Sequence, residues 1–153
     1  QGGYVLGVCN GFQILTESGL LPGALLHNTD RKFICKNVYI KPASSKTPIT
    51  AGLSMEDVYK IPIAHGEGRF YASDETIAQL QDNEQILFQY CRVDGKIDPE
   101  NNPNGSLLNI AGITNKSKNV FGMMPHPERA ADTTLNNRDG LALFESILTH
   151  CKA

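Results

Sequence analysis

A cysteine between two glycines is the residue of this sequence best placed for chemistry. It lies in the pentapeptide GVCNG, residues 7–11, directly after an apolar run. The spacing is typical of a nucleophile elbow, a strained strand-to-helix turn whose flanking glycines let neighbouring backbone pass close by. There Cys9 would lie at a helix N-terminus, which stabilises a thiolate, and the backbone N–H of Asn10 could donate to an oxyanion. A buried structural cysteine flanked by glycines for packing is the alternative that this local pattern leaves open.

A thiolate nucleophile needs a base, and the base needs a group that orients it. His126, in the sequence MMPHPER, follows an apolar run and so falls at a strand end, as Cys9 does. Pro125 and Pro127 would stiffen the segment into an extended form, in which residues two apart point to the same side. Glu128 could then hold one imidazole nitrogen and leave the other facing the cysteine. A proline-rich turn with solvated charges is the alternative.

The other three histidines lie in different surroundings. His27 lies in a polar loop and is read as a surface residue, and His150 lies in the last turn of a predicted helix, where a cation suits the helix dipole. His65 opens the sequence HGEGR, residues 65–69, with two glycines and three ionisable groups. Glycines beside polar groups suit a loop that approaches a ligand closely, and an ordinary β-turn is the alternative.

The elements that must position these groups follow from hydrophobic patterning. Apolar or alternating runs predict strands at 4–8, 32–41, 58–64, 70–72, 85–93, 109–114 and 119–124. Amphipathic periodicity and capping residues predict helices at 10–18, 74–81 and 138–150. Pro62 places the run at 58–64 at a sheet edge or makes it a strand end, and 42–54 and 101–105 read as loops. The order indicates an α/β domain whose sheet is partly parallel and carries an antiparallel portion.

Composition bounds the function classes. With 153 residues, 41% of them hydrophobic and 20% charged, the chain is long enough for one domain with a proper core. A net charge of −2 gives no indication of a basic surface that would bind nucleic acid, and the apolar runs are too short to cross a membrane. The four cysteines, at 9, 35, 91 and 151, form no CxxC pair and no zinc-ligand spacing. We therefore expect reduced thiols in a cytoplasmic protein without a metal site.

Three segments together resemble the class I, or triad, glutamine amidotransferases: GVCNGFQILTESGLLPGALL, IPIAHGEGRFYA and VFGMMPHPERA. Within that class they look like the small, free-standing glutaminase subunits of phosphoribosylformylglycinamidine synthase, from de novo purine biosynthesis. The resemblance covers the chain almost end to end. It implies one glutaminase domain over residues 1–153 with a flavodoxin-like, three-layer α/β fold, in which a mostly parallel sheet carries helices on both faces.

The resemblance also implies roles for matching positions. Cys9 would attack the side-chain amide of L-glutamine to give a thioester and ammonia. His126 would be the general base and then the acid, with Glu128 as its orienter. The backbone N–H of Asn10 would donate to the oxyanion, and Gln13 would help to hold the glutamine.

Further implications concern the pocket and the partners. The loop of His65, Gly66 and Glu67 is similar to the segment that lines the glutamine pocket in this class, largely through its main chain. Ammonia would pass to a separate synthetase subunit, which would bind ATP, Mg²⁺ and the ribonucleotide, and a small accessory subunit would assist assembly. No cofactor and no metal are expected in this chain.

The chain departs from the family pattern at its start, since it begins with Gln1 and not with Met, directly before a predicted core strand. Family members begin with an earlier strand and carry a glycine-rich loop that supplies a second oxyanion donor. Loss of one such donor typically slows the reaction by about a hundred- to a thousandfold. We therefore expect an N-terminally incomplete domain that is poorly active alone, with a catalytically impaired docking module as the alternative function. A peptidase or stress protein with a cysteine elbow is a weaker alternative, because it is not expected to carry both HGEGR and MPHPER.

Overall fold

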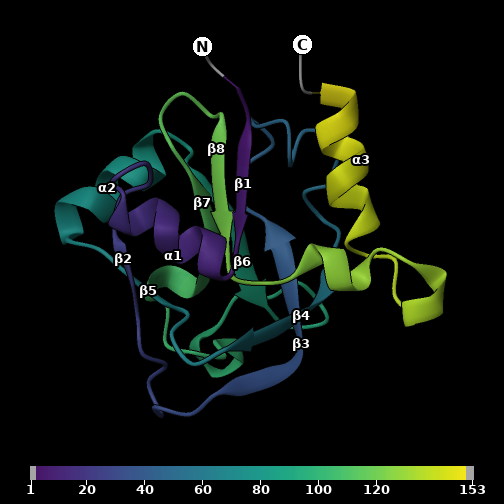
Figure 1. The fold of residues 1–153 in the computed structure, drawn as a ribbon, viewed down its shortest axis with the longest axis horizontal. Helices are drawn as coiled ribbons and strands as arrows, with labels where there is room; N and C mark the ends of the chain where they lie inside the picture. Colours follow the sequence, from purple (N-terminus) through teal and green to yellow (C-terminus); the bar gives the residue numbers. More distant parts are fainter. Residues whose placement is uncertain (1–2, 151–153) are drawn as a thin grey trace.

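The computed structural model describes residues 3–150, which form an α/β fold with two sheets (Figure 1). The large sheet has the strand order β1-β8-β7-β6-β3-β4, and the small sheet pairs β2 with β5. The strands are β1 Val5–Val8, β2 Ala24–Leu26, β3 Ile34–Pro42, β4 Tyr59–His65, β5 Arg69–Tyr71, β6 Ile86–Cys91, β7 Ile110–Thr114 and β8 Val120–Met123. The helices are α1 Asn10–Glu17, α2 Asp74–Asp82 and α3 Leu141–His150. Four 3₁₀ turns accompany them: η1 Pro99–Asn101, η2 Leu107–Asn109, η3 Pro127–Ala130 and η4 Thr133–Leu135.

The predicted helices and strands are all confirmed, with bounds that differ by one to three residues. The prediction for Pro62 is confirmed as well, because β4 lies at an edge of the large sheet. Strand β2 was missed, since it has three residues and directly follows the turn signal Pro22-Gly23. Cys151, one of the four cysteines expected to be reduced, lies outside the described residues.

The large sheet is mixed, which corrects the expectation of a mostly parallel sheet. Among residues 3–150, one of its five strand pairs, β1 with β8, is parallel, and the other four are antiparallel. For β7 and β8 the reason is the short connection: residues 115–119 are too few for the crossover that a parallel pair needs. The α/β class itself is confirmed.

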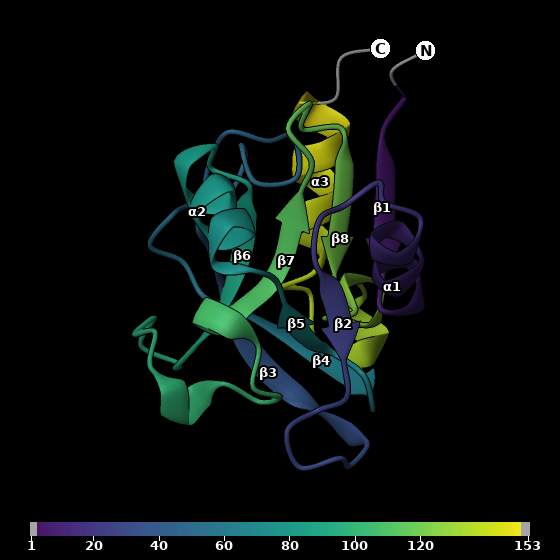
Figure 2. The same ribbon diagram turned by 90° about the vertical axis from the view of Figure 1, so that its left-hand side faces the viewer.

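Helices cover both faces of the large sheet, which gives the expected three layers (Figure 2). On one face, Phe12 of α1 and Leu80 of α2 pack in a buried cluster with Val120 of β8. On the other face, Leu143 of α3 packs in a second cluster with Phe121. Val120 and Phe121, adjacent on β8, therefore pack in clusters on opposite faces of the sheet, because the side chains of a strand alternate between its two faces.

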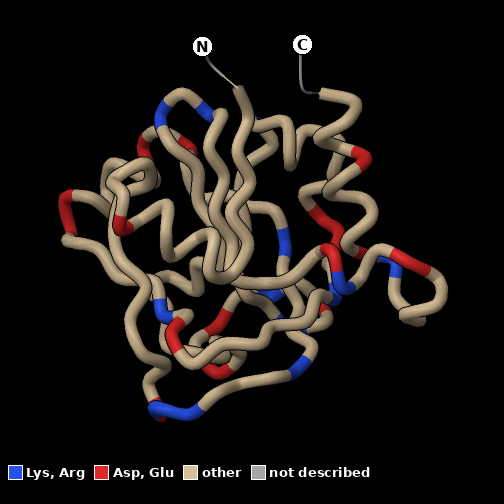
Figure 3. Tube along the Cα trace, in the orientation of Figure 1, with Lys and Arg blue, Asp and Glu red and all other residues tan. Residues whose placement is uncertain are grey.

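Charged residues are dispersed over this framework. Figure 3 shows Lys and Arg positions interspersed with Asp and Glu along the loops and the helices. Within the part of the chain that the structure describes, no helix is both long and apolar enough to cross a membrane.

The two glycines of the GVCNG sequence differ in their surroundings. A Cβ atom on Gly7 would lie 2.5 Å from Cδ1 of Leu15 and 2.6 Å from the carbonyl carbon of Gly11. The prediction that glycine admits neighbouring backbone is thus confirmed at Gly7, where α1 packs on β1. Apart from its chain neighbours and the nearby backbone of α1, a Cβ atom on Gly11 would meet nothing within 4 Å, so no close packing explains this second glycine.

The contrast predicts opposite effects of alanine at the two positions. Gly7→Ala should lower the free energy of unfolding by about 1–3 kcal/mol, because α1 must move away from β1. Gly11→Ala lies inside α1 and should be neutral or stabilise by up to about 1 kcal/mol through helix propensity. Urea unfolding of both variants beside the wild type tests this, and equal effects at the two positions would contradict the packing described here.

Candidate active site

Cys9 forms the turn between β1 and α1 with φ of 52° and ψ of −105°. A positive φ is uncommon outside glycine and costs on the order of 1–3 kcal/mol, so the surrounding contacts must hold it. Its N–H donates to the carbonyl of Met123 at 2.9 Å, and its carbonyl accepts from the N–H of Gln13 at 3.1 Å. The backbone geometry of the predicted elbow is therefore confirmed, and the catalytic role of the thiol stays a prediction.

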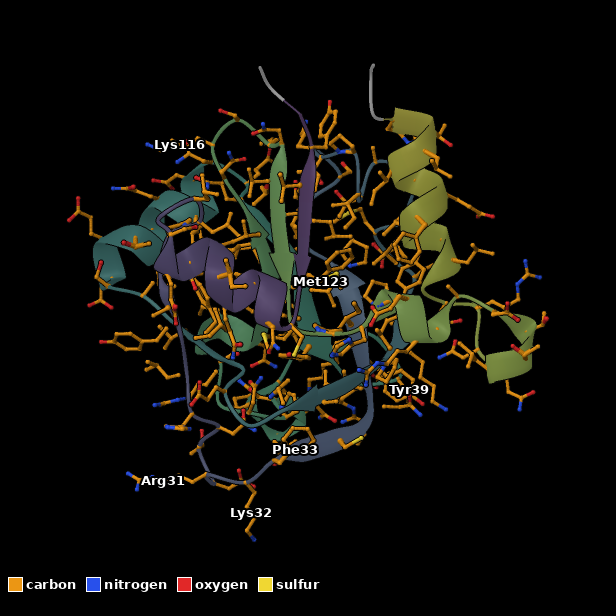
Figure 4. All side chains as sticks on the ribbon, in the orientation of Figure 1. Arg31, Lys32, Phe33, Tyr39, Lys116 and Met123 are labelled. Carbon is orange, nitrogen blue, oxygen red and sulfur yellow. The ribbon has the colours of Figure 1, made fainter. Side chains whose placement is uncertain are left out.

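The parallel pairing of β1 with β8 brings the two predicted catalytic segments to one end of the sheet. Val8 lies beside Met123 in this pairing, so Cys9 and the segment that leads to His126 leave the sheet together. Met123, labelled in Figure 4, lies at the end of β8 beside the start of α1. Strand β4 passes across this end of the two strands (Figure 1).

The outer edge of β4 holds both segments. The N–H of His126 donates to the carbonyl of Pro62 at 2.8 Å, and Sγ of Cys9 lies 3.7 Å from the carbonyl oxygen of Ala64. These two carbonyls are two residues apart on an extended strand, roughly 7 Å, and point to the same side. Pro62 fits at this edge because it has no N–H, so no donor is left without a partner there. Cys9 and His126, which are 117 positions apart in the sequence, are thus held by carbonyls only two residues apart on one strand.

The predicted pair of His126 and Glu128 is in contact. Nδ1 of His126 lies 2.6 Å from Oε1 of Glu128, and Nε of Arg129 lies 3.6 Å from the same oxygen. The backbone that makes this contact differs from the prediction, since the residues after His126 form the 3₁₀ turn η3 and not an extended segment. Pro127 explains the difference, because its fixed φ suits the first position of a helical turn.

The contact with Glu128 sets the proton positions on His126. An ionised carboxylate only accepts hydrogen bonds, so Nδ1 of His126 carries the hydrogen, and in a neutral ring the lone pair lies on Nε2. Nε2 is buried and has no hydrogen-bond partner among the described residues. The ring therefore offers a free proton acceptor inside the site.

The thiol of Cys9 is held in its neutral form. Burial raises its pKa, as does the negative charge of Glu128, while the backbone N–H of Asn10 and the charge of Arg129 lower it. The predicted stabilisation of a thiolate by the helix N-terminus is thus present at Asn10 but is outweighed by burial. A neutral thiol needs a base to take its proton before it can attack as a thiolate, and the role of His126 as that base stays a prediction.

The predicted glutamine-binding loop of His65, Gly66 and Glu67 is tied to α1. Nε2 of Gln13 donates to the carbonyl of Glu67 at 2.8 Å, so in this structure the side chain holds the loop. The carboxylate of Glu67 is half exposed and lies 3.3 Å from Nδ1 of His27. The loop therefore turns its main chain, and not this carboxylate, toward α1.

His65 is 3% exposed, and its imidazole lies against Gly68, where a Cβ atom would come within 2.3 Å of Cε1. Burial and, to a smaller extent, the neighbouring His126 together lower the pKa of His65 to about 4. His65 is therefore neutral at pH 7, and its buried Nε2 has no hydrogen-bond partner among the described residues.

Sequence reasoning missed the polar residues that hold this loop. Asn28 is buried and forms hydrogen bonds with His65, Gly66 and Gly68. Asn104 and Ser106 both donate to the carbonyl of Gly68, at 2.8 and 3.3 Å. Asparagine and serine in polar stretches such as HNTD and NNPNGS look like ordinary loop residues, so one sequence carries no signal for them. Within residues 3–150, no group of three or more His, Cys, Asp or Glu side chains could hold a metal ion.

Comparison with known proteins defines the class. The family model described as a CobB/CobQ-like glutamine amidotransferase domain matches residues 1–145, so the chain belongs to this family of glutamine amidotransferases.

More particular likenesses lie within the class. The chain is 56% identical over 153 residues to the phosphoribosylformylglycinamidine synthase subunit PurQ of Acaryochloris marina, covering 100% of this chain and 65% of that protein. The subunit of the same name from Aquifex aeolicus is 52% identical over 149 residues, covering 97% and 66%. The solved structure of PurLQS from Thermotoga maritima matches with a TM-score of 0.83 at 42% identity, covering 99% of this chain and 63% of that chain. The chain thus spans about 65% of the length of the curated relatives it matches.

The burial of His65 predicts a loss of stability in acid. Because its pKa in the folded chain, about 4, lies below the ordinary 6.5, the unfolded chain binds more protons as the pH falls from 6.5 to 4. The free energy of unfolding should fall by about 3 kcal/mol over this window through His65 alone. Urea titrations at pH 4 to 7 measure it. His65→Gln should remove this part of the pH dependence, and the exposed-site control His27→Gln should retain it; identical slopes in both variants would contradict the assignment.

Proposed function

We propose that this chain carries out the glutaminase step of phosphoribosylformylglycinamidine synthase in de novo purine biosynthesis. The observation that carries the proposal is the convergence, at the joint end of β1 and β8, of the Cys9 elbow with the pair of His126 and Glu128. The likeness to PurQ subunits, at 52–56% identity in the two described above, supports this particular synthase among the reactions of glutamine amidotransferases.

The first half-reaction forms a thioester and releases ammonia. The proton of the Cys9 thiol moves to Nε2 of His126, and the sulfur attacks the side-chain carbonyl carbon of glutamine. The N–H of Asn10 donates to the oxyanion that forms, and Glu128 stabilises the imidazolium. His126 then returns the proton to the amide nitrogen as the carbon–nitrogen bond breaks, so that ammonia leaves and the acyl group remains on sulfur.

The second half-reaction hydrolyses the thioester. His126 takes a proton from a water molecule, whose oxygen attacks the thioester carbon, and the same oxyanion donor serves again. The carbon–sulfur bond breaks, the proton returns to the sulfur, and glutamate leaves. The sum is glutamine and water to glutamate and ammonia, and every proton moves among Cys9, His126, substrate and water.

The same proposal assigns the remaining chemistry to partners. Ammonia passes to a synthetase subunit, which binds ATP, Mg²⁺ and the ribonucleotide, and a small accessory subunit assists assembly. The subunit designation of the relatives and the likeness to PurLQS support a role within such a complex. We place the reaction in the cytoplasm, where purine precursors and ATP are available, and propose no cofactor for this chain.

Replacement of the nucleophile tests the reaction in the full-length enzyme with its synthetase partner. Cys9→Ala should lower glutamine-dependent synthesis by at least about a thousandfold, while synthesis from added ammonium salt continues at the wild-type rate. Cys35→Ala, at an exposed thiol, should leave both rates unchanged. Retention of glutamine-dependent synthesis in Cys9→Ala would refute the proposal and favour a docking role alone.

Covalent labelling gives an independent test. A glutamine analogue with an electrophilic carbon in place of the amide should modify Cys9, because the site binds its amino-acid end and presents the sulfur to that carbon. Peptide mass spectrometry should find the label on Cys9 and not on Cys35, Cys91 or Cys151, and excess glutamine should protect. Labelling of the exposed Cys35 in preference to Cys9 would count against a glutamine site.

A further inference from the structure

Asn28 uses its whole hydrogen-bonding capacity to hold the loop at residues 65–68. Its Nδ2 donates to the carbonyls of Lys32 and His65 at 2.8 and 2.9 Å. Its Oδ1 lies 3.1 Å from both the N–H of Gly68 and Nδ1 of His65. Its backbone N–H donates to the carbonyl of Gly66 at 2.9 Å. A residue 37 positions away in the sequence thus fixes three residues of the loop and one imidazole ring.

These contacts determine the tautomer of His65. The two backbone carbonyls only accept, so the atom of Asn28 that faces them must be the NH₂ group. The other amide atom is then the oxygen, which also accepts from the N–H of Gly68. Because that oxygen cannot donate, Nδ1 of His65 carries the hydrogen and Nε2 carries the lone pair.

The two buried histidines of the site are therefore alike except in one respect. His65 and His126 both carry hydrogen on Nδ1 and both bury an unpartnered Nε2. The Nδ1 of His126 donates to the carboxylate of Glu128, whereas the Nδ1 of His65 donates to the amide of Asn28. A carboxylate stabilises a neighbouring imidazolium and a neutral amide does so far less, so the amide of Asn28 leaves unopposed the burial that lowers the pKa of His65.

We propose that Asn28 is a positioning residue of the glutaminase site, which fixes the loop at 65–68 and keeps His65 neutral, so that the Cys9 proton passes to His126. The inference rests on the glutaminase function proposed above and adds to it how the site distinguishes its two histidines. A charged His65 would repel the positive charge that His126 acquires in each half-reaction, since the charge of His126 acts on His65 in the structure.

The titratable groups around His65 come from four elements. Cys9, at the start of α1, contacts the carbonyl of the preceding residue, Ala64. Tyr90 of β6 lies 3.5 Å from Nδ2 of Asn104, the residue that donates to the loop at Gly68. His126 acts on the pKa of His65 from the segment at η3, where it contacts Glu128, and Glu67 and Arg69 lie on the loop of His65 and on β5. None of these carboxylates makes a salt bridge to His65 among the described residues, which leaves Asn28 as its partner at Nδ1.

Two substitutions at the same position test the proposal in the full-length enzyme with its synthetase partner. Asn28→Asp places a carboxylate against Nδ1 of His65 and should raise the pKa of His65 by about 1–3 units. The acidic limb of the kcat/KM profile for glutamine should then move to higher pH by about one unit, with a roughly tenfold loss near pH 6.5. Asn28→Leu removes the same loop contacts without a charge and should lower kcat/KM without moving the limb. Parallel losses in both variants with an unmoved limb would show a structural role only and overturn the proposal.

A measurement on the wild-type protein covers the case in which neither variant folds. Nitrogen-15 NMR of the histidine rings should show His65 neutral, with hydrogen on Nδ1, from pH 5 to pH 8. A charged ring at pH 7, or hydrogen on Nε2, would overturn the proposal. This readout needs no glutaminase activity, so it separates an error about Asn28 from an error about the reaction.

Discussion

The site depends on two carbonyl groups at the outer edge of one strand. On β4, the carbonyl of Pro62 accepts from the backbone of His126, and the carbonyl of Ala64 faces the sulfur of Cys9. The edge strand reaches both because it crosses the end where β1 and β8 leave the sheet (Figure 1). The spacing between the proposed nucleophile and the proposed base is therefore set by the regular repeat of an extended strand, and not by the loops that carry the two residues.

Burial then sets the resting charge of the site. The same exclusion of water raises the pKa of the Cys9 thiol and lowers the pKa of His65, so both groups are neutral before a substrate enters. In the proposed reaction, charge appears when the Cys9 proton moves to His126, beside the N–H of Asn10 and the carboxylate of Glu128. The lowered pKa of His65 reduces the stability of the fold in acid, as is common where a site buries a histidine.

The parts predictable from the sequence were those with short-range signals. The elbow at Cys9 and the pairing of His126 with Glu128 follow from spacing and from apolar runs that mark strand ends, although the pair is reached through a 3₁₀ turn. The direction of the strands did not follow, because the long connection between β3 and β4 carries no sign of which way the chain returns. Asn28 could not be found either: a loop asparagine gains its role only when folding brings a partner 37 positions away against it.

Pro62 has a second effect on how the protein behaves in a crowded solution. An exposed edge strand is a template for pairing with another chain, and β4 borders the sheet on this side. An incoming strand would find no donor at Pro62 and a carbonyl already engaged by His126. Pro62 therefore both anchors the backbone of the proposed base and removes two pairing groups from this edge, which disfavours edge-to-edge association.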